Sequence, residues 1–389
     1  MTSLLNLSKK NIGLAIGLTL LLFSCGGGKT ASSQGEGDTV AFKYATQLSV
    51  VRYDGYTVVT LKNPWKEGMT LHQYLLVPTS AAADSSLFTL HSSFPNATII
   101  RTPLSRSMIF STVHCAMLMD FGKQDCIAGV ADLKYIKIPW IQQQVKEGKI
   151  SDVGDGLSPV IEKIIDQHPD ALFLSPFENS GGYGKLEDID IPLVECAEYM
   201  EPSPLARAEW MKFYGLLFGE YDKADSLFQV VDQHYQTLKA QAAKAGKGRE
   251  ALIDKMVGSV WYVPGGHSTL GQMVRDANGR YPWAADDHSG SLSLPFEAVL
   301  EKGGEADVWF YRYSSDHPTN YRELLSEHRG YDQLKACRQR QVYACNVEQT
   351  LFYEETPFRP DYLLSDFILL LHPDLQSDAS LRYFTLLDE

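Results

Sequence analysis

The sequence predicts an α/β protein with two Rossmann-like lobes joined by one long helix, and a small β-rich extension before them. Short apolar segments alternate with helical segments in two separate stretches, residues 102–220 and 246–389. Between them, residues 221–245 space apolar side chains at helical intervals, over roughly 36 Å at a helical rise of about 1.5 Å per residue. A chain of 389 residues is also too long for one ordinary core.

The N-terminal residues 1–24 are typical of an export signal. Lys9 and Lys10 precede an uncharged, mostly apolar run over residues 12–23. In a helix this run covers about 18 Å, which is too short for a hydrocarbon core of about 30 Å. The sequence therefore predicts a signal segment rather than a permanent membrane span.

The end of this apolar run, Ser24-Cys25, resembles the bacterial lipobox. The resemblance implies that Cys25 becomes the lipidated first residue of the mature protein; a plain signal peptide with an incidental cysteine is the alternative. Residues 25–38, rich in Gly and Ser, are then expected to form a flexible tether between the lipid and the folded domain. Gly26-Gly27-Gly28-Lys29 resembles the end of a phosphate-binding loop. Such a loop must follow a buried strand, and no predicted strand precedes this segment.

Charge and cysteine content narrow the class of protein. The formal net charge of −13 argues against binding to nucleic acid, which depends on neutralising phosphates. The cysteines that remain after lipidation are Cys115, Cys126, Cys196, Cys337 and Cys345. Their odd number leaves at least one thiol unpaired within the chain. Cys337 and Cys345 either form a disulfide in an oxidising compartment or remain buried free thiols, and the sequence leaves both open.

The pattern along the chain predicts individual elements. Alternation on both sides of Asp54-Gly55 predicts a hairpin in a β-rich extension over residues 39–101. Ser203 and Pro204 begin a helix that breaks near Gly219. Predicted strands lie at residues 108–111, 127–130, 150–153, 171–174, 193–196, 256–262, 307–311 and 341–345. Predicted helices lie at residues 113–121, 159–167, 221–245, 269–276, 296–301 and 359–371, with Pro159 opening the second.

Several segments between about residues 105 and 375 resemble the class III periplasmic binding proteins of ABC importers. The segments are Asp152-Val153-Gly154, residues 159–165, residues 168–174, residues 191–194, residues 204–210, residues 261–267, residues 293–297 and Ala306-Asp307-Val308. The resemblance implies a lipid-anchored, Bacteroidetes-type substrate-binding protein on the periplasmic face of a bacterial membrane. It implies a monomer without enzymatic activity or resident cofactor, which captures an iron complex (siderophore or haem) or cobalamin and delivers it to an ABC transporter permease.

The resemblance also implies two docking residues. In this family a glutamate near the start of one helix in each lobe pairs with arginines of the permease, and Glu162 and Glu297 occupy the matching positions. A carboxylate accepts paired hydrogen bonds from a guanidinium, so the chemistry suits the role. The alternative is that each is an ordinary solvated glutamate of an acidic protein.

The ligand is expected between the lobes, where loops leave the carboxyl ends of the strands. Aromatic side chains suit the flat face of a macrocycle or catecholate, and the Gly265-Gly266 turn is expected to let a ligand approach the backbone. His114 and His267 are candidates to bind the metal of the complex, although a structural role is the more common one for a histidine. The candidate ligand-binding residues are Ser111, Thr112, His114, Asp155, Tyr183, Trp261, Tyr262, His267, Arg312 and Tyr353.

Three other functions compete with this interpretation. An enzyme is disfavoured because the mature chain holds no complete nucleophile-elbow, zinc-protease, Cys-x-x-Cys or dinucleotide motif. A zinc or manganese importer component needs three or four converging His and carboxylate ligands, and the chain lacks a histidine-rich loop. Asp286-Asp287-His288 lies in a polar loop typical of a solvated turn. A purely structural lipoprotein would not need two α/β lobes with a cleft.

Overall fold

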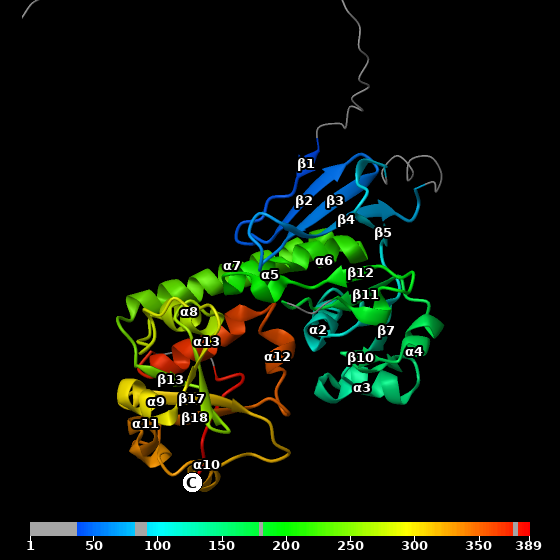
Figure 1. Cartoon of the computed structure of the whole chain (residues 1–389). Helices are drawn as coiled ribbons and strands as arrows, with labels where there is room; N and C mark the ends of the chain where they lie inside the picture. The colour runs from blue at the N-terminus through cyan, green and yellow to red at the C-terminus, as the bar shows by residue number, and fades with distance from the viewer. Residues whose placement is uncertain (1–36, 82–91, 179–181, 376–379) are drawn as a thin grey trace, which may run out of the picture. The chain divides into compact units, whose positions relative to one another are not determined.

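Residues 37–81, 92–178, 182–375 and 380–389 are described by the structure, a computed structural model (Figure 1). They confirm the predicted fold class: two α/β lobes are joined by one long helix, and a β-rich extension precedes them. The predicted signal segment, the lipidation residue Cys25 and the tether up to residue 36 lie outside the described residues. Within the described residues, no helix combines the length and the apolar character needed to cross a membrane.

The extension is one five-stranded sheet in the order β1-β2-β3-β4-β5, drawn in blue in Figure 1. Its strands are antiparallel except for the parallel pair β4–β5. The predicted hairpin at Asp54-Gly55 is confirmed, because Tyr53 pairs with Tyr56 and Gly55 has a positive φ of 82°. The strands are β1 Asp38–Thr39, β2 Leu48–Tyr53, β3 Tyr56–Lys62, β4 Thr70–Pro78 and β5 Thr98–Thr102.

Two buried carboxylates attach the extension to the first lobe. Glu209 accepts the backbone N–H groups of Lys43, Tyr44 and Ala45 at 2.7–2.9 Å. Glu201 accepts those of the next two residues, 46 and 47, at 2.8–3.0 Å. Since backbone N–H groups withdrawn from water need acceptors, these side chains fix the path of residues 43–47 across the lobe.

The first lobe contains a parallel sheet in the order β12-β11-β6-β7-β8. The two strands that read as apolar runs, β7 and β11, are buried at every residue, as expected of strands covered on both faces. The strands are β6 Ser107–Ile109, β7 Ile127–Val130, β8 Ser151–Asp152, β11 Ala171–Leu174 and β12 Leu193–Glu195. The α-helices are α2 Thr112–Asp120, α3 Pro139–Lys146 and α4 Ile161–Asp166, and the 3-10 turns are η1 Gln124–Cys126, η2 Leu133–Tyr135, η3 Gly184–Leu186 and η4 Glu198–Met200.

One prediction in this lobe is wrong. Pro159 does not open a helix but ends the small hairpin of β9 Gly154–Asp155 and β10 Ser158–Pro159. The helix α4 begins two residues later, at Ile161. Proline is compatible with an edge strand as well as with a first helical turn, so its presence did not distinguish the two.

A helical segment leads from the first lobe to the second. The oxygen of Ser203 accepts the N–H of Ala206 at 3.1 Å, which confirms the predicted N-cap of α5 Pro204–Glu209. After α6 Met211–Phe218, Gly219 has a positive φ of 71° and ends the helix, as predicted. The 24-residue helix α7 Tyr221–Lys244 follows. It packs against α5 and α6 of the first lobe and against α8 and α13 of the second, with only one face buried (Figure 1).

The second lobe combines two sheets. The larger has the order β13-β17-β18-β19, with β19 antiparallel, and the smaller is the antiparallel β14-β15-β16. The strands are β13 Ala251–Ile253, β14 Met256–Val257, β15 Val260–Pro264, β16 Ser291–Leu294, β17 Val308–Tyr313, β18 Val342–Asn346 and β19 Thr385–Leu386. The helices are α8 Thr269–Asp276, α9 Phe296–Gly303, α10 Tyr321–Glu327, η5 Tyr331–Gln333, α11 Lys335–Arg338, α12 Phe352–Glu355 and α13 Pro360–Leu371.

The single strand predicted at residues 256–262 is wrong. The chain turns at Gly258, whose φ is 62°, and forms the hairpin β14–β15. The parallel strand that the sheet needs is β13, three residues earlier in the chain than the predicted one. The two residues between β14 and β15 are too few to interrupt the apolar pattern, so the hairpin reads as one strand.

The five described cysteines are free thiols. Cys337 and Cys345 are both buried and unbridged, so the free-thiol alternative holds for this pair. Burial raises the pKa of the Cys345 thiol to about 11, which keeps it protonated and unreactive at neutral pH.

Candidate functional site

A cavity of about 780 Å³ lies in the first lobe at the carboxyl ends of β6 and β11. Phe110 follows β6, and Ser175 and Phe177 follow β11; all three line the cavity. After β6 the chain adds β7 and β8 on one side of it, and then β11 and β12 on the other side. The cavity therefore lies where the strand order reverses, which is where open α/β sheets bind their ligands.

The wall of the cavity exposes apolar side chains. Leu157, in the turn between β9 and β10, is 85 % exposed, and Phe177 is 50 % exposed. Val160 and Phe110 extend this apolar surface, while Tyr183 and Lys185 supply polar atoms. Exposed apolar side chains around a concave surface, with a few polar groups among them, are typical of a small-molecule site.

Of the predicted ligand-binding residues, Tyr183 lines this cavity. Its hydroxyl donates to Oε1 of Glu195 at 3.1 Å, and burial together with this carboxylate raises the pKa of Tyr183. The phenol is therefore protonated at neutral pH. Asp155 lies beside the cavity, where its Oδ1 accepts the N–H of Leu157 at 2.8 Å and shapes the turn.

Residues of the β-rich extension contact Glu195, the hydrogen-bond partner of Tyr183. The N–H of Glu195 donates to the hydroxyl of Tyr74 at 2.8 Å, and Nδ1 of His72 lies 3.4 Å from Oε2 of Glu195. His72 and Tyr74 belong to β4 of the extension. No sequence pattern predicts this contact, because the partners lie more than a hundred residues apart.

Ser111 and Thr112 lie at the start of α2, where the two lobes meet. The hydroxyl of Thr112 donates to Oε1 of Glu354 in α12 at 3.0 Å, and the N–H of Lys137 donates to the same oxygen at 3.0 Å. The ammonium of Lys137 also pairs with Glu348. Glu354 is buried, so these bonds form a closed contact between α2 and α12. Thr112 thus has a partner within the protein, and Ser111 caps α2 without a side-chain hydrogen bond.

The candidates of the second lobe do not line the cavity. Arg312 makes a paired contact with Asp254, at 3.0 and 2.6 Å. Tyr262 and Tyr353 are each about half exposed. His267 is exposed, with Nε2 3.9 Å from Asp287 in the polar loop.

Two further candidates are buried and do not line the cavity. Trp261 is fully buried, donates its Nε1–H to the carbonyl of Ile253 at 2.9 Å, and packs against Trp309. Its neighbour Tyr262 points to the other side of β15, because successive residues of a strand face opposite sides. His114 is also buried, among the rings of Phe173, Tyr214 and Phe358.

The Gly265-Gly266 turn serves the fold rather than a ligand. A Cβ on Gly266 would lie 2.5 Å from the carbonyl oxygen of Trp283 and closer still to that of Asp286. A Cβ on Gly265 would meet the carbonyl of His288 just as closely. The loop of residues 283–290, rather than a ligand, therefore packs closely against the backbone of these two glycines.

We expect Gly266→Ala to lower the free energy of unfolding by about 1–3 kcal/mol, because the loop carbonyls must move to admit the methyl group. Gly290→Ala, in the same loop, is the matched control, since nothing lies within 4 Å of its Cβ position. Denaturant titration of both variants checks the prediction. Equal midpoints for the two variants would show that the loop does not constrain the turn.

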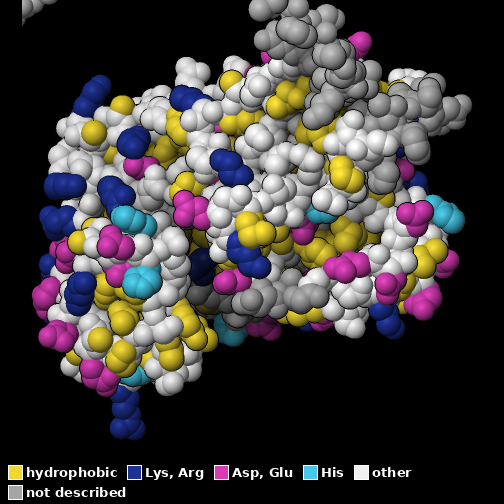
Figure 2. Space-filling model, turned by 45° about the horizontal axis from the view of Figure 1, so that its top comes forward, with side chains coloured by type: hydrophobic (Ala, Val, Ile, Leu, Met, Phe, Trp, Pro, Cys, Tyr) yellow, Lys and Arg dark blue, Asp and Glu magenta, His cyan; other side chains and the backbone are white. Residues whose placement is uncertain are grey.

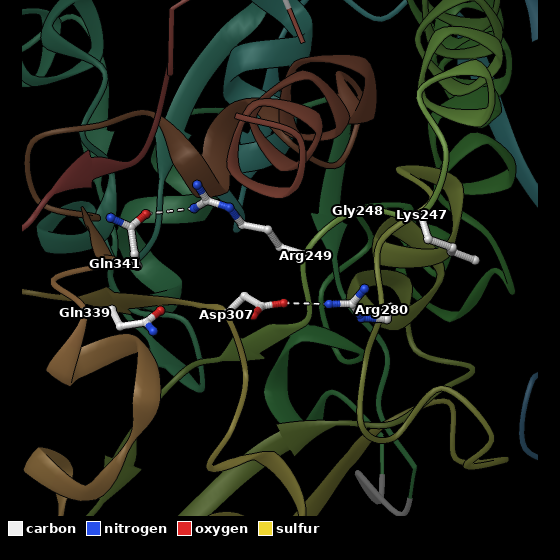
Figure 3. Close-up of a pocket in the computed structure, with 7 residues that line it drawn as sticks. All are labelled: Lys247, Gly248, Arg249, Arg280, Asp307, Gln339 and Gln341. Carbon is white, nitrogen blue, oxygen red and sulfur yellow. Dashed lines mark hydrogen bonds and ion pairs between the residues drawn. The ribbon is translucent and has the colours of Figure 1, made fainter. Parts of the chain in front are cut away.

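A second depression, of about 520 Å³, lies in the second lobe (Figure 3). Arg249, Asp307 and Gln341, which line it, precede the strands β13, β17 and β18. Figure 3 shows Arg249 paired with Gln341 and Arg280 paired with Asp307, each at 2.7 Å. It lies at the amino ends of the strands, the edge opposite to the usual ligand site, so the first-lobe cavity is the better candidate.

The two predicted docking glutamates occupy equivalent positions in their helices. Glu162 lies in the first turn of α4 and Glu297 in the first turn of α9, and both are exposed. Neither has a hydrogen-bond or ion-pair partner among the residues with described positions. On the face shown in Figure 2, acidic and basic side chains are interspersed and hydrophobic side chains are exposed between them.

Two α/β lobes on one stiff helix, with a cavity at the sheet reversal, define a substrate-binding protein of the class III type. The comparison with protein families agrees. The model described as "Periplasmic binding protein" matches residues 117–348, more than half of the chain, so the chain belongs to this family.

Known relatives and solved structures are similar to this chain over most of its length. An uncharacterized lipoprotein of Methanocaldococcus jannaschii, MJ0878, is 25% identical over 299 residues, which are 74% of this chain and 70% of the relative. A periplasmic heme binding protein from Pseudomonas aeruginosa superposes with a TM-score of 0.59 at 16% identity, covering 72% of this chain and 97% of its own. A protein of an ABC-type Fe3+-hydroxamate transport system from Saccharomonospora viridis gives 0.53 at 19% identity, covering 69% and 93%. These similarities show the fold.

Proposed function

We propose that the protein is the substrate-binding component of an ABC importer, and that it captures an iron complex, either a siderophore or haem, or else cobalamin. The observation that supports this most is the cavity at the carboxyl ends of β6 and β11, with exposed Leu157 and Phe177 in its wall. The family supports transport without covalent chemistry. The names of two structural neighbours, a hydroxamate system and a heme binder, support a metal complex as cargo.

The chemistry of the cavity favours a chelated metal over a bare ion. Zinc and manganese need several His or carboxylate ligands around one point. Among the described residues that line the cavity, Glu162 is the one carboxylate and no histidine is present. Apolar and aromatic faces with a few polar anchors instead suit the organic part of a complex, and about 780 Å³ is a volume typical of such ligands.

The place of action follows from the N-terminus. We propose that Cys25 is lipidated and holds the protein at the periplasmic face of a bacterial membrane as a monomer. The lipoprotein name of the relative supports the lipid anchor. The assignment to a Bacteroidetes-type lipoprotein and the absence of a resident cofactor stay predictions.

Titration of the purified protein with haemin, a ferric hydroxamate and cyanocobalamin tests the proposal. We expect one of them to bind and to change the tyrosine and tryptophan fluorescence, and Phe177→Ala to weaken that binding about tenfold. Loss of an aromatic contact of about 1.4 kcal/mol corresponds to that factor. Tyr135→Ala is the matched control, because Tyr135 is a 61 % exposed aromatic side chain of the same lobe that does not line the cavity.

The outcomes separate the alternatives. Binding of a complex that Phe177→Ala and Tyr135→Ala leave equally strong would place the ligand elsewhere. Binding of zinc chloride within the cavity, without any of the three complexes, would favour the zinc or manganese importer. Chemical conversion of a bound complex would favour an enzyme.

A further inference from the structure

Three buried side chains of different types converge behind the first-lobe sheet. His114 lies in the first turn of α2, Cys196 directly follows β12, and Glu198 begins η4. Each is at most 2 % exposed. One ring nitrogen of His114, the sulfur of Cys196 and a carboxylate oxygen of Glu198 all lie within 4.8 Å of one another. The sequence places two of these residues far from the third, so the fold alone brings them together.

The imidazole of His114 lacks hydrogen-bond partners. Neither Nδ1 nor Nε2 makes a hydrogen bond, and the nearest carboxylate oxygen, Oε1 of Glu198, is 3.6 Å from Nε2. Three aromatic residues, Phe173, Tyr214 and Phe358, surround the imidazole, and the hydroxyl of Tyr214 donates to Glu198 rather than to His114. A buried polar atom without a partner is rare and costs about 1–3 kcal/mol. An imidazole with two such atoms therefore points to a partner that is not an amino-acid side chain.

We propose that His114, Cys196 and Glu198 bind a zinc-type divalent cation as a structural site of the first lobe. Imidazole nitrogen, thiolate sulfur and carboxylate oxygen are the ligand atoms that zinc takes in proteins. At bond lengths of about 2.0–2.3 Å around a tetrahedral ion, neighbouring ligand atoms are roughly 3.3–3.5 Å apart. The 3.6 Å between His114 and Glu198 is close to this value, whereas the three ligand atoms as a group lie within 4.8 Å and must come closer to bind one ion. A water molecule would fill the fourth position of the tetrahedron.

The neighbours of the three residues hold them in place. The second oxygen of Glu198, Oε2, accepts the hydroxyl of Tyr214 at 2.7 Å, which leaves Oε1 directed at His114. The N–H of Cys196 donates to the carbonyl of Leu174 at 2.7 Å and so fixes its backbone to β11. Hydrogen bonds from outside the ligand set are what orient the ligands of protein-bound zinc.

This cation is distinct from the transported cargo. None of the three residues lines the 780 Å³ cavity, and their burial closes them off from a ligand there. A cation would join α2 to the end of β12 and so stabilise the lobe permanently. The proposal therefore stands or falls separately from the proposed function.

A buried ion network is the competing explanation. Arg207 lies near Glu198, and its single positive charge would balance that carboxylate without any metal. The two explanations differ in the state of Cys196. Burial raises the pKa of this thiol, so it carries its proton when no metal is bound and must release it to bind one.

Refolding of the whole protein with cobalt or zinc tests the proposal. The chain is unfolded in denaturant with a chelator and a reductant, refolded with a slight excess of Co²⁺ or Zn²⁺, and passed through a desalting column. We expect about one metal ion per chain, a thiolate-to-cobalt absorption band, and a higher melting temperature than for protein refolded with the chelator. Bound metal should decrease as the pH falls, because protons compete for the thiolate.

The variants assign the site. Cys196→Ser and His114→Gln should lower metal retention more than tenfold, while Cys345→Ser, which removes another buried free thiol, should keep it. Wild-type protein that refolds without metal and melts at the same temperature with and without zinc would overturn the proposal, whatever the variants do. Metal and the absorption band retained by a folded Cys196→Ser would overturn it as well.

Discussion

Glu209→Ala is expected to lower the free energy of unfolding by about 3–5 kcal/mol. The carboxylate is fully buried and accepts three backbone N–H groups of the extension. It also pairs with the ammonium of Lys212 at 3.1 Å, itself almost buried. Removal of the carboxylate leaves those donors without an acceptor and leaves Asp225 as the remaining partner of the Lys212 ammonium. Denaturant titration measures the loss.

A double-mutant cycle separates the two parts of this effect. Glu209→Gln keeps an acceptor oxygen but leaves the charge of Lys212 uncompensated, apart from its 2.9 Å contact with Asp225. We expect Glu209→Gln with Lys212→Met to be more stable than Glu209→Gln alone, since the uncompensated charge is then gone. Glu220→Ala, which breaks the surface pair with Lys123, is the control and should leave the midpoint nearly unchanged. A Glu209→Ala midpoint like that of the control would contradict the role given to this carboxylate.

Replacement of both docking glutamates, Glu162→Arg with Glu297→Arg, is expected to lower uptake at least tenfold. Glu162 also lines the first-lobe cavity, so uptake is compared at a ligand concentration that saturates the purified variant. If the permease presents arginines to these positions, each substitution exchanges an attractive pair for a repulsive one. A loss of about 1.4 kcal/mol in binding free energy lowers the affinity for the permease tenfold. Both side chains are exposed, so the substitutions should not disturb the fold. Transport of the radiolabelled ligand in cells, together with its affinity for the purified variant, measures the two effects.

Asp166→Arg with Glu301→Arg is the matched control. These residues lie one helical turn further along α4 and α9, are exposed, and change the net charge by the same amount. Uptake at the wild-type level is expected for this pair. If both pairs reduce uptake equally, general charge rather than docking is responsible; if neither does, the docking role of Glu162 and Glu297 is wrong.

The parts of the fold that depend on neighbouring residues could be predicted from the sequence. Ser203 caps α5, Gly219 ends α6 and Asp54-Gly55 turns the first hairpin, because each works through atoms a few residues away. The turn at Gly258 was missed because apolar residues flank it on both sides. Lobe order and the long helix followed from the alternation of strands and helices, which a local error does not change.

The candidate site was harder to predict, because a site depends on which side of an element a residue faces. Trp261 and Tyr262 are adjacent in the sequence, yet one is in the core and the other is exposed. Leu157 was missed as part of the cavity because a single leucine in a polar turn reads as an incidental residue. The hydrogen bond from Glu195 to Tyr74 joins residues 121 positions apart, and no local sequence pattern predicts it.

Glu354 affects how easily the two lobes can separate. Its buried carboxylate accepts the hydroxyl of Thr112 and the backbone N–H of Lys137 from the other lobe. If the lobes separate, that N–H loses its acceptor and the carboxylate must be rehydrated or find new donors. The apo protein is therefore expected to resist opening on its own. Contacts that offset the cost of these two hydrogen bonds, such as contacts with a permease, would then favour an open state.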